Sequence, residues 1–182
     1  MANHKIAALV GMCGSGKSVV CDMFVNRGWN RIYFGQVTMD ELSARGLEKN
    51  EKNERSVREE LRRVHGPAAF AKLLLPSIEK ARLEGDTILD GLYSWSEYKC
   101  LKEHFGDDLT VIAVITDRKV RYERLTTRVI RPLTNEEAQS RDYAEIENLE
   151  KGGPISIADI FLLNNGDVDA LSQRIDEIIK SL

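Results

Sequence analysis

The sequence predicts a three-layer α/β/α fold, in which helices cover both faces of a five-stranded parallel sheet. Two observations predict it: short continuous apolar runs, and their alternation with longer segments of helical periodicity. A continuous apolar run is typical of a strand that is buried on both faces of a parallel sheet. Because alternating strands and helices form parallel βαβ units, ligands are expected at the carboxyl ends of the strands.

Four apolar runs are expected to be strands, at residues 6–10, 87–90, 109–115 and 160–163. Residues 31–34 form a weaker fifth candidate, since this run is short and lies between Asn30 and Gly35. Apart from the long stretch described next, helical patterns cover residues 17–26, 94–105, 118–127, 135–151 and 167–181. The order along the chain is therefore strand, helix, strand throughout.

Two segments depart from this simple alternation. Residues 36–85 are too many for one crossover helix, so we expect an inserted helical lobe that binds the phosphate acceptor, with breaks at Gly66-Pro67 and near Pro76. Residues 129–141 contain Pro132 and follow a helix without an intervening strand. This second segment is expected to form a lid.

Length and charge restrict the class of protein. A chain of 182 residues is expected to form a single domain, residues 1–182. A formal net charge of −3 excludes a broad basic surface for nucleic acid, so a small-molecule partner is expected. The apolar runs are too short to span a membrane, no signal-peptide pattern is present, and the three cysteines form no CxxC pair. These features predict a cytoplasmic protein.

Residues 11–18 read Gly-Met-Cys-Gly-Ser-Gly-Lys-Ser and match the pattern G-x-x-x-x-G-K-[ST] of the P-loop, directly between a predicted strand and a predicted helix. Its glycines allow a tight turn whose N–H groups cradle phosphate oxygens at a helix N-terminus. Lys17 is expected over the β and γ phosphates, and the Ser18 hydroxyl is a candidate Mg²⁺ ligand. The predicted ATP-binding residues of this segment are Gly11, Cys13, Gly14, Ser15, Gly16, Lys17, Ser18 and Val19.

Two further features indicate phosphoryl transfer. Asp90 ends a predicted strand near the P-loop, where a carboxylate is expected to hold Mg²⁺ or orient the acceptor hydroxyl; the alternative is a plain Asp-Gly turn. Arginines then recur at spacings of three, four and three, which places the first three at least along one helical face; they are Arg121, Arg124, Arg128 and Arg131. Such cations neutralise the transferring group, although a solvated helix face is the alternative.

Together these motifs resemble the dephospho-CoA kinases and their adenylate-kinase-like relatives among the nucleotide kinases. The likeness covers nearly the whole chain, and includes Leu-Thr-Asn-Glu-Glu-Ala-x-x-Arg at 133–141 and Ala-Asp followed by Asn-x-Gly at 158–166. It implies ATP and Mg²⁺ as cofactors, with Lys17, Asp90 and Arg128 as catalytic residues. It also implies that Arg124, Arg128 and Arg141 bind the triphosphate, and that Asn164 lies beside the base.

The acceptor itself is left open by two departures. Relatives carry an arginine at the positions of Met39 and Tyr93, where it could meet an acceptor phosphate. Arg45, Arg58, Arg62 or Arg63 of the inserted lobe could compensate. The main expectation is a kinase for a nucleotide-like or nucleoside-like molecule. The alternatives are a regulatory P-loop NTPase, and an ATP-binding module that has lost its acceptor.

Overall fold

The computed structural model describes residues 4–130 and 132–182. Its strands are β1 (Ile6–Val10), β2 (Asn30–Tyr33), β3 (Thr87–Asp90), β4 (Leu109–Ile115) and β5 (Ile160–Leu163). They form one sheet in the order β2-β3-β1-β4-β5, and each neighbouring pair is parallel. The predicted three-layer fold with a five-stranded parallel sheet is confirmed.

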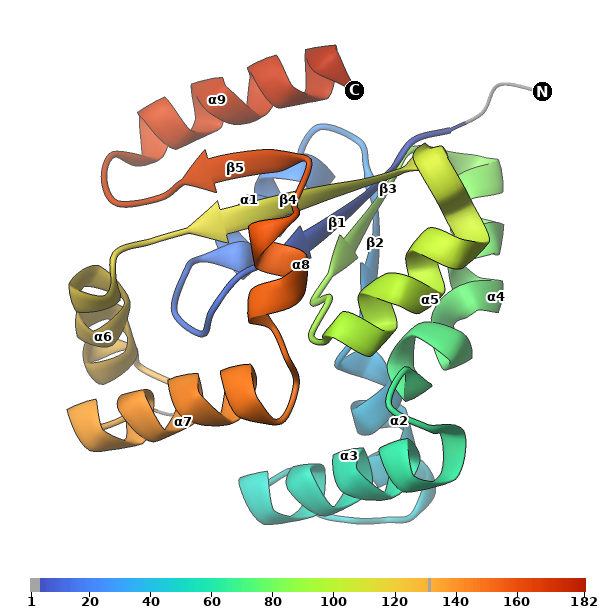
Figure 1. The fold of residues 1–182 in the computed structure, drawn as a ribbon, viewed down its shortest axis with the longest axis vertical. Coiled ribbons are helices and arrows are strands. Elements are labelled where there is room, and N and C mark those ends of the chain that lie inside the picture. The colour runs from blue at the N-terminus through green and yellow to red at the C-terminus, as the bar shows by residue number, and fades with distance from the viewer. Residues whose placement is uncertain (1–3, 131) are drawn as a thin grey trace.

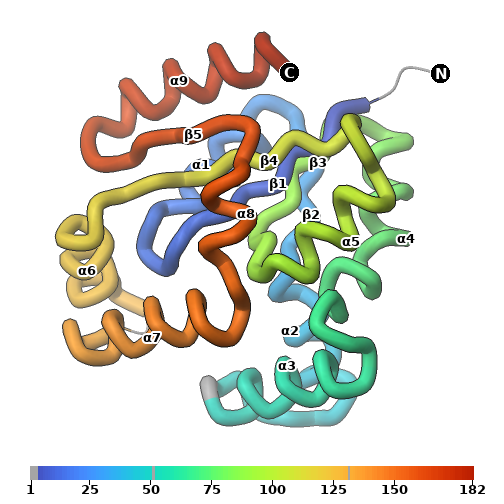
Figure 2. Tube along the Cα trace, viewed as in Figure 1, coloured from blue at the N-terminus to red at the C-terminus, as the bar shows by residue number. Residues whose placement is uncertain are grey.

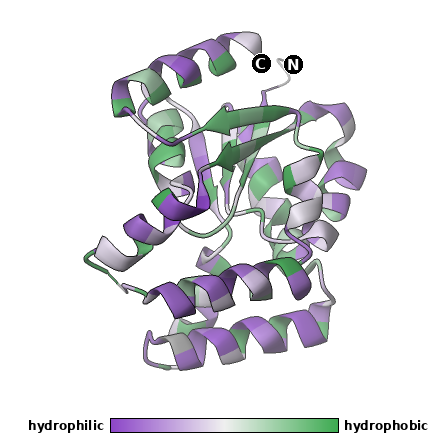
Figure 3. Ribbon diagram, turned by 60° about the vertical axis from the view of Figure 1, so that its left-hand side comes forward, coloured by the Kyte–Doolittle hydropathy of each residue, from purple (hydrophilic) through white to green (hydrophobic). Residues whose placement is uncertain are grey.

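Helices cover both faces of this sheet (Figure 1). One face packs against α1 (Lys17–Val25) and α9 (Val168–Ser181), and the other against α4 (Ala69–Glu84), α5 (Trp95–Phe105) and α8 (Gly152–Ser156). Residues of β1 alternate between the two cores, so the strand is apolar on both sides. Figure 3 shows the same division, with hydrophobic strands inside and hydrophilic helix surfaces outside.

Residues 36–85, where an inserted acceptor-binding lobe is predicted, contain α2 (Gln36–Ala44), α3 (Glu51–His65) and α4, and α4 packs on the sheet. The side chain of Asn50 caps α3 by accepting a hydrogen bond from Asn53 N at 2.9 Å. Gly66 follows the last turn of α3 with a φ of 85°, a conformation that favours glycine. The predicted break at Gly66-Pro67 is therefore confirmed.

The predicted break near Pro76 is wrong, because Pro76 lies inside the continuous helix α4. Proline removes one main-chain hydrogen bond from a helix interior and normally kinks or ends it. Here the opposite face of α4 is anchored in the core by Phe70, Leu74 and Ile78, all of them buried. Burial of that face outweighs the lost hydrogen bond.

The long connection between β4 and β5 contains α6 (Arg118–Thr127) and α7 (Asn135–Glu147). Thr134 and Glu137 form a reciprocal capping box at the start of α7, so residues 135–141 of the predicted lid are helical. The predicted helix over 135–151 is wrong at its end: α7 stops at Glu147, Glu150 adopts a φ of 50°, and α8 follows. Arg131 lies outside the described residues.

The tube trace shows the two long connections between strands (Figure 2). One runs between β2 and β3 through α2, α3 and α4, and the other runs between β4 and β5 through α6, α7 and α8. Helices α2 and α3 on one side, and α6 and α7 on the other, extend past the carboxyl ends of the strands (Figure 1). Within the described ranges, none of the helices has the length and apolar character that crossing a membrane requires.

Candidate functional site

The P-loop joins β1 to α1, and its glycines are required by close contacts. Gly11 has a φ of 153°, and a Cβ added there would lie 2.5 Å from the carbonyl oxygen of Val114. Gly16 has a φ of 89°, and a Cβ there would lie 2.3 Å from Nδ2 of Asn164. Both positions exclude larger residues, so the sequence motif is explained by the packing of the loop.

Two buried side chains hold this loop from the ends of β4 and β5. The carboxamide of Asn164 donates a hydrogen bond to the carbonyl oxygen of Ser15 at 2.8 Å. The hydroxyl of Thr116 also reaches the Ser15 carbonyl, at 3.0 Å, and the main-chain oxygen of Asn164, at 3.1 Å. Asn164 therefore contacts the P-loop itself, and its predicted contact with a base stays a prediction.

Arg121 fixes the loop from the other side. Its guanidinium donates to the carbonyl oxygen of Cys13 at 3.0 Å and makes two hydrogen bonds with Asp142, at 2.8 and 2.7 Å. Both Arg121 and Asp142 are buried. This paired, bidentate geometry joins α6, α7 and the P-loop, so the first arginine of the predicted series has a structural contact with the loop.

Lys17 is placed as the motif predicts, at the first position of α1. Its ammonium donates to the carbonyl oxygens of Gly11 at 2.7 Å and Met12 at 3.1 Å. Burial, and then repulsion by Lys151, lower the pKa of Lys17 to about 8. An arriving anion favours the charged ammonium, so phosphate binding is expected to raise this pKa.

An ion pair that the sequence did not indicate lies at the same place. Oε2 of Glu145 accepts a hydrogen bond from the main-chain N–H of Cys13 at 3.1 Å and contacts Nζ of Lys151 at 2.8 Å. Lys151 is only 2% exposed, and its ammonium lies 5.5 Å from the centre of the Tyr93 ring. Burial tends to raise the pKa of Glu145, but Lys151 and the other nearby cations hold it below its ordinary value.

The remaining predicted cations lie on the lid side of the loop. Nη1 of Arg124 is 3.7 Å from the position that a Cβ on Gly16 would take. Across residues 4–130 and 132–182, this nitrogen has no hydrogen-bond partner. Arg128 follows the last residue of α6, and Nε of Arg141 lies 3.6 Å from Oε1 of Glu145. Triphosphate contacts of these arginines stay predictions.

The predicted magnesium ligands lie on neighbouring elements. Asp90 is 4% exposed at the end of β3, in register with Leu9 of β1, and pairs with Arg31. Ser18 is exposed at the start of α1. Mg²⁺ usually keeps several waters and uses one or two carboxylates with substrate phosphates, and this donor set fits that habit. In the described part of the chain, no group of three or more His, Cys, Asp or Glu side chains forms a metal cage.

A buried carboxyl group lies where the inserted lobe meets α5. Glu97 is 0% exposed, and its Oε2 accepts a hydrogen bond from Tyr93 N at 2.9 Å. Burial raises the pKa of Glu97 to about 7, although the hydrogen bond from Tyr93 N and the nearby Arg62 oppose this change. The guanidinium of Arg62 lies 4.9 Å from the centre of the Phe70 ring. A cavity of about 250 Å³ adjoins them and is lined by Arg62, Pro67, Ser94, Ser96, Asn148, Leu149 and Glu150.

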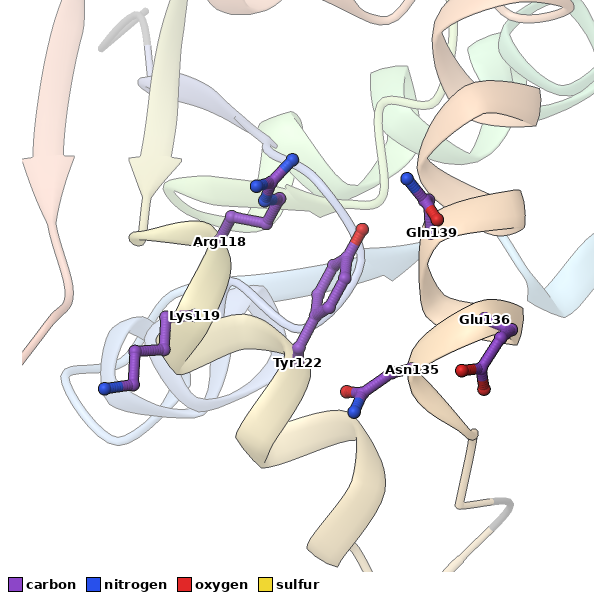
Figure 4. Close-up of a pocket in the computed structure, with 6 residues that line it drawn as sticks. All are labelled: Arg118, Lys119, Tyr122, Asn135, Glu136 and Gln139. Atoms are coloured by element: carbon purple, nitrogen blue, oxygen red, sulfur yellow. The ribbon is translucent and has the colours of Figure 1, made fainter.

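A larger and more open hollow of about 490 Å³ lies between α6 and α7 (Figure 4). Its lining residues are Arg118, Lys119, Tyr122, Asn135, Glu136 and Gln139. The Tyr122 hydroxyl points between Arg118 and Gln139 in this view. None of the P-loop residues lines this hollow, so its position separates it from the predicted reaction centre.

Comparisons with known proteins agree with this architecture. A family model described as AAA domain matches residues 8–146. The UPF0200 protein of Thermococcus kodakarensis is 33% identical over 97% of this chain and 100% of its own length. The UPF0200 protein of Thermococcus gammatolerans is 30% identical over 97% of this chain and 95% of its own length.

Solved structures share the fold. Dephospho-CoA kinase from Campylobacter jejuni has a TM-score of 0.59 and 17% identity, over 97% of this chain and 96% of that one. The crystal structure of TT1252 from Thermus thermophilus has a TM-score of 0.54 and 17% identity, over 99% and 98% of the two chains. The resemblance to the dephospho-CoA kinase type of P-loop protein is thereby confirmed at the level of the fold. The chain therefore belongs to the AAA domain family that its residues 8–146 match, and to the UPF0200 family of its Thermococcus relatives.

Proposed function

We propose that the protein is a phosphotransferase, which moves the γ-phosphoryl group of ATP to a nucleotide-like or nucleoside-like small molecule. The observation that carries this proposal is the P-loop with three cations around it: Lys17, Lys151 and Arg124, whose Nη1 has no hydrogen-bond partner among the described residues. Phosphoryl transfer depends on positioning and on neutralising the charge of the transferred group. A ring of cations around an amide cradle supplies both.

Each part of the site has a role in this reaction. The P-loop amides and Lys17 bind the phosphate tail, and Arg124 lies at the Gly16 side of the loop. When bound with the nucleotide, Mg²⁺ neutralises charge on the phosphates, and Ser18 and Asp90 are the residues that would hold it. Asp90 also orients the acceptor, whose oxygen forms the new bond to the γ-phosphorus as the bond from that phosphorus to the bridging oxygen of the leaving ADP breaks. The lid helices exclude water that would hydrolyse ATP.

The inserted lobe is the proposed acceptor side. Arg62 of α3 and Tyr93 before α5 border the carboxyl-end side of β3, where Asp90 lies. Within the described ranges, Nε of Arg62 is buried without a hydrogen-bond partner. A buried donor without a partner is costly, so an anionic or oxygen-rich acceptor group that fills this place would be stabilised.

Transfer of label from ATP tests the proposal. The protein is incubated with γ-labelled ATP, Mg²⁺ and a panel of nucleoside monophosphates, nucleosides and dephospho-CoA, and the products are separated. We expect one acceptor class to become labelled. A Lys17→Ala variant should lose the transfer, whereas Lys180→Ala, an exposed lysine on α9, serves as the matched control.

A regulatory P-loop NTPase or ATP-binding protein without a small-molecule acceptor is the second candidate, and one observation favours the loss of the acceptor. Met39 and Tyr93 stand where relatives of the kinase type carry arginines, which removes two phosphate-binding forks. The same assay separates the two candidates. Slow release of inorganic phosphate with no labelled acceptor would favour the regulatory protein, and ATP binding without turnover would favour a binding module.

A further inference from the structure

The carboxylate of Glu145, an anion of the protein itself, already lies against the P-loop. One atom, Oε2 of Glu145, accepts from the main-chain N–H of Cys13 at 3.1 Å and contacts the ammonium of Lys151 at 2.8 Å. Amides of a P-loop bind phosphate oxygens. The carboxylate oxygen therefore occupies a position that suits a phosphate oxygen, and it joins a loop amide to a buried cation.

Several cations surround the Glu145 carboxylate. Lys151 lies at 2.8 Å and Arg141 at 3.6 Å from its carboxylate, and its charge also acts on Lys17. A second carboxylate, Asp90, is already paired with Arg31. Lys17, Arg141 and Lys151 thus all act on the Glu145 carboxylate, which lies against an amide of the loop. A polyphosphate carries more negative charge than one carboxylate and has more oxygens with which to contact these cations.

Lys151 is held in place by packing as well as by charge. Its ammonium lies over the Tyr93 ring at 5.5 Å, and the segment before it is fixed to α5 by a hydrogen bond from Trp95 N to Leu149 O at 3.1 Å. A Cβ on Gly153 would approach Trp95 to 2.9 Å, so this segment lies close against the indole. Tyr93 stands where the kinase relatives carry an arginine, and its side chain has no positive charge. The ammonium of Lys151 places a positive charge beside the Tyr93 ring.

We propose that Lys151 is a phosphate-binding residue of this site, and that Glu145 is an internal competitor that leaves the Cys13 amide when a triphosphate tail arrives. The inference rests on the proposed triphosphate site and deepens it. A phosphate oxygen that takes the place of Oε2 meets the Cys13 N–H and the Lys151 ammonium at once. No covalent bond changes in this exchange.

Binding of inorganic tripolyphosphate, measured by titration calorimetry with Mg²⁺, tests the exchange. This probe carries the phosphate tail without base or acceptor, so its binding does not depend on any transfer activity. Lys151→Met should weaken binding at least about tenfold, and Lys151→Arg should retain most of it. Glu145→Gln removes the competing charge and should strengthen binding roughly tenfold. Glu177→Gln on α9, where Glu177 pairs with Arg174 on the surface, is the matched control.

Two results would overturn the proposal. If Lys151→Met lowered the melting temperature but left tripolyphosphate affinity unchanged, the pair would be structural only. If Glu145→Gln bound the probe no better than the native chain, Glu145 would not be a competitor. Absence of any phosphorylated acceptor, with these affinities as expected, would count against the proposed kinase activity alone.

The native chain gives an independent measurement if the Glu145→Gln variant does not fold. The carboxyl carbon of Glu145, followed by NMR during a pH titration, reports its pKa with and without tripolyphosphate. Release from Lys151 and the Cys13 amide should raise this pKa from its lowered value toward the ordinary one. An unchanged titration, with the probe bound, would also overturn the proposal.

Discussion

At the scale of single residues, Glu97 is unusual among ionisable side chains because it is completely buried. It is 0% exposed, and among the described residues its Oε1 has no hydrogen-bond partner. Burial disfavours the charged carboxylate and raises its pKa to about 7. The folded state therefore binds a proton on Glu97 more tightly than the unfolded state does, and part of the stability is lost as the pH rises through about 7.

We expect Glu97→Gln to remove this pH dependence. The amide oxygen can still accept from Tyr93 N, and it carries no charge to bury. From pH 4.5 to pH 8 the variant should gain up to about 3 kcal/mol in unfolding free energy relative to the native chain. Urea unfolding at several pH values measures the difference. A difference that stays constant with pH would mean that the Glu97 carboxyl titrates normally.

At the scale of elements, the packing around the P-loop explains why its motif requires glycine. Gly16 and Gly28 both have a φ of 89°, so both lie in the left-handed region. Only the surroundings differ: a Cβ on Gly28 meets nothing within 4 Å, whereas one on Gly16 would lie 2.3 Å from the Asn164 amide. The pair separates the cost of backbone strain from the cost of a clash.

Gly28→Ala is expected to cost about 1–2 kcal/mol of stability through its backbone alone and to leave MgATP binding unchanged. Gly16→Ala should cost a further 1–3 kcal/mol or so, because the Asn164 carboxamide must leave the Ser15 carbonyl. It should also weaken MgATP binding at least about tenfold, since the cradle shifts. Thermal unfolding and calorimetry measure the two effects. Equal losses of stability and affinity in both variants would contradict this account.

Helix α4 offers a prediction in the opposite direction. Pro76 is exposed within the helix, and its ring nitrogen cannot donate the main-chain hydrogen bond of a helix interior. Pro76→Ala should stabilise the protein by about 1–2 kcal/mol, because the restored helix interior outweighs the greater freedom of the unfolded chain. A higher urea midpoint with an unchanged slope checks this. A lower midpoint would show that Pro76 is needed where it stands.

These elements also show what the sequence could predict and what it could not. Strands β1, β3 and β4 begin and end where their apolar runs do, because they are buried on both faces or nearly so. The edge strand β5 also matches its apolar run, although Phe161 and Leu163 are exposed. Strand β2 is shifted by one residue, since this edge strand only partly buries alternate positions and gives a weak signal. The continuity of α4 depends on burial of its far face, and no local pattern around Pro76 reveals that.

At the scale of the whole molecule, the predicted site divides into two parts. The P-loop residues are contiguous, so the motif alone placed them correctly at the β1–α1 junction. Glu145 and Lys151 reach Cys13 only because the chain turns back after α7, and in the sequence they lie within an ordinary charged stretch. Glu150, with its φ of 50°, and the Gly152-Gly153 pair mark that turn, but their residue types do not say what it contacts.

The arrangement of the layers places helices of both long connections at the carboxyl ends of the strands. Helices α2 and α3 border one side of the P-loop end of the sheet, and α6 and α7 border the other (Figure 1). An acceptor on the first side and a nucleotide on the second would meet at the loop between them. This arrangement requires that residues 11–18 bind a triphosphate.

Titration calorimetry with MgATP on the native chain and on Lys17→Ala tests this claim most directly. Lys17 lies at the first turn of α1, with its ammonium on the loop carbonyls, so its removal should spare the fold while taking away the central cation. We predict saturable one-site binding to the native chain, and loss of at least about two orders of magnitude in affinity for the variant. No binding to a folded native chain, or equal affinity in both proteins, would contradict the account.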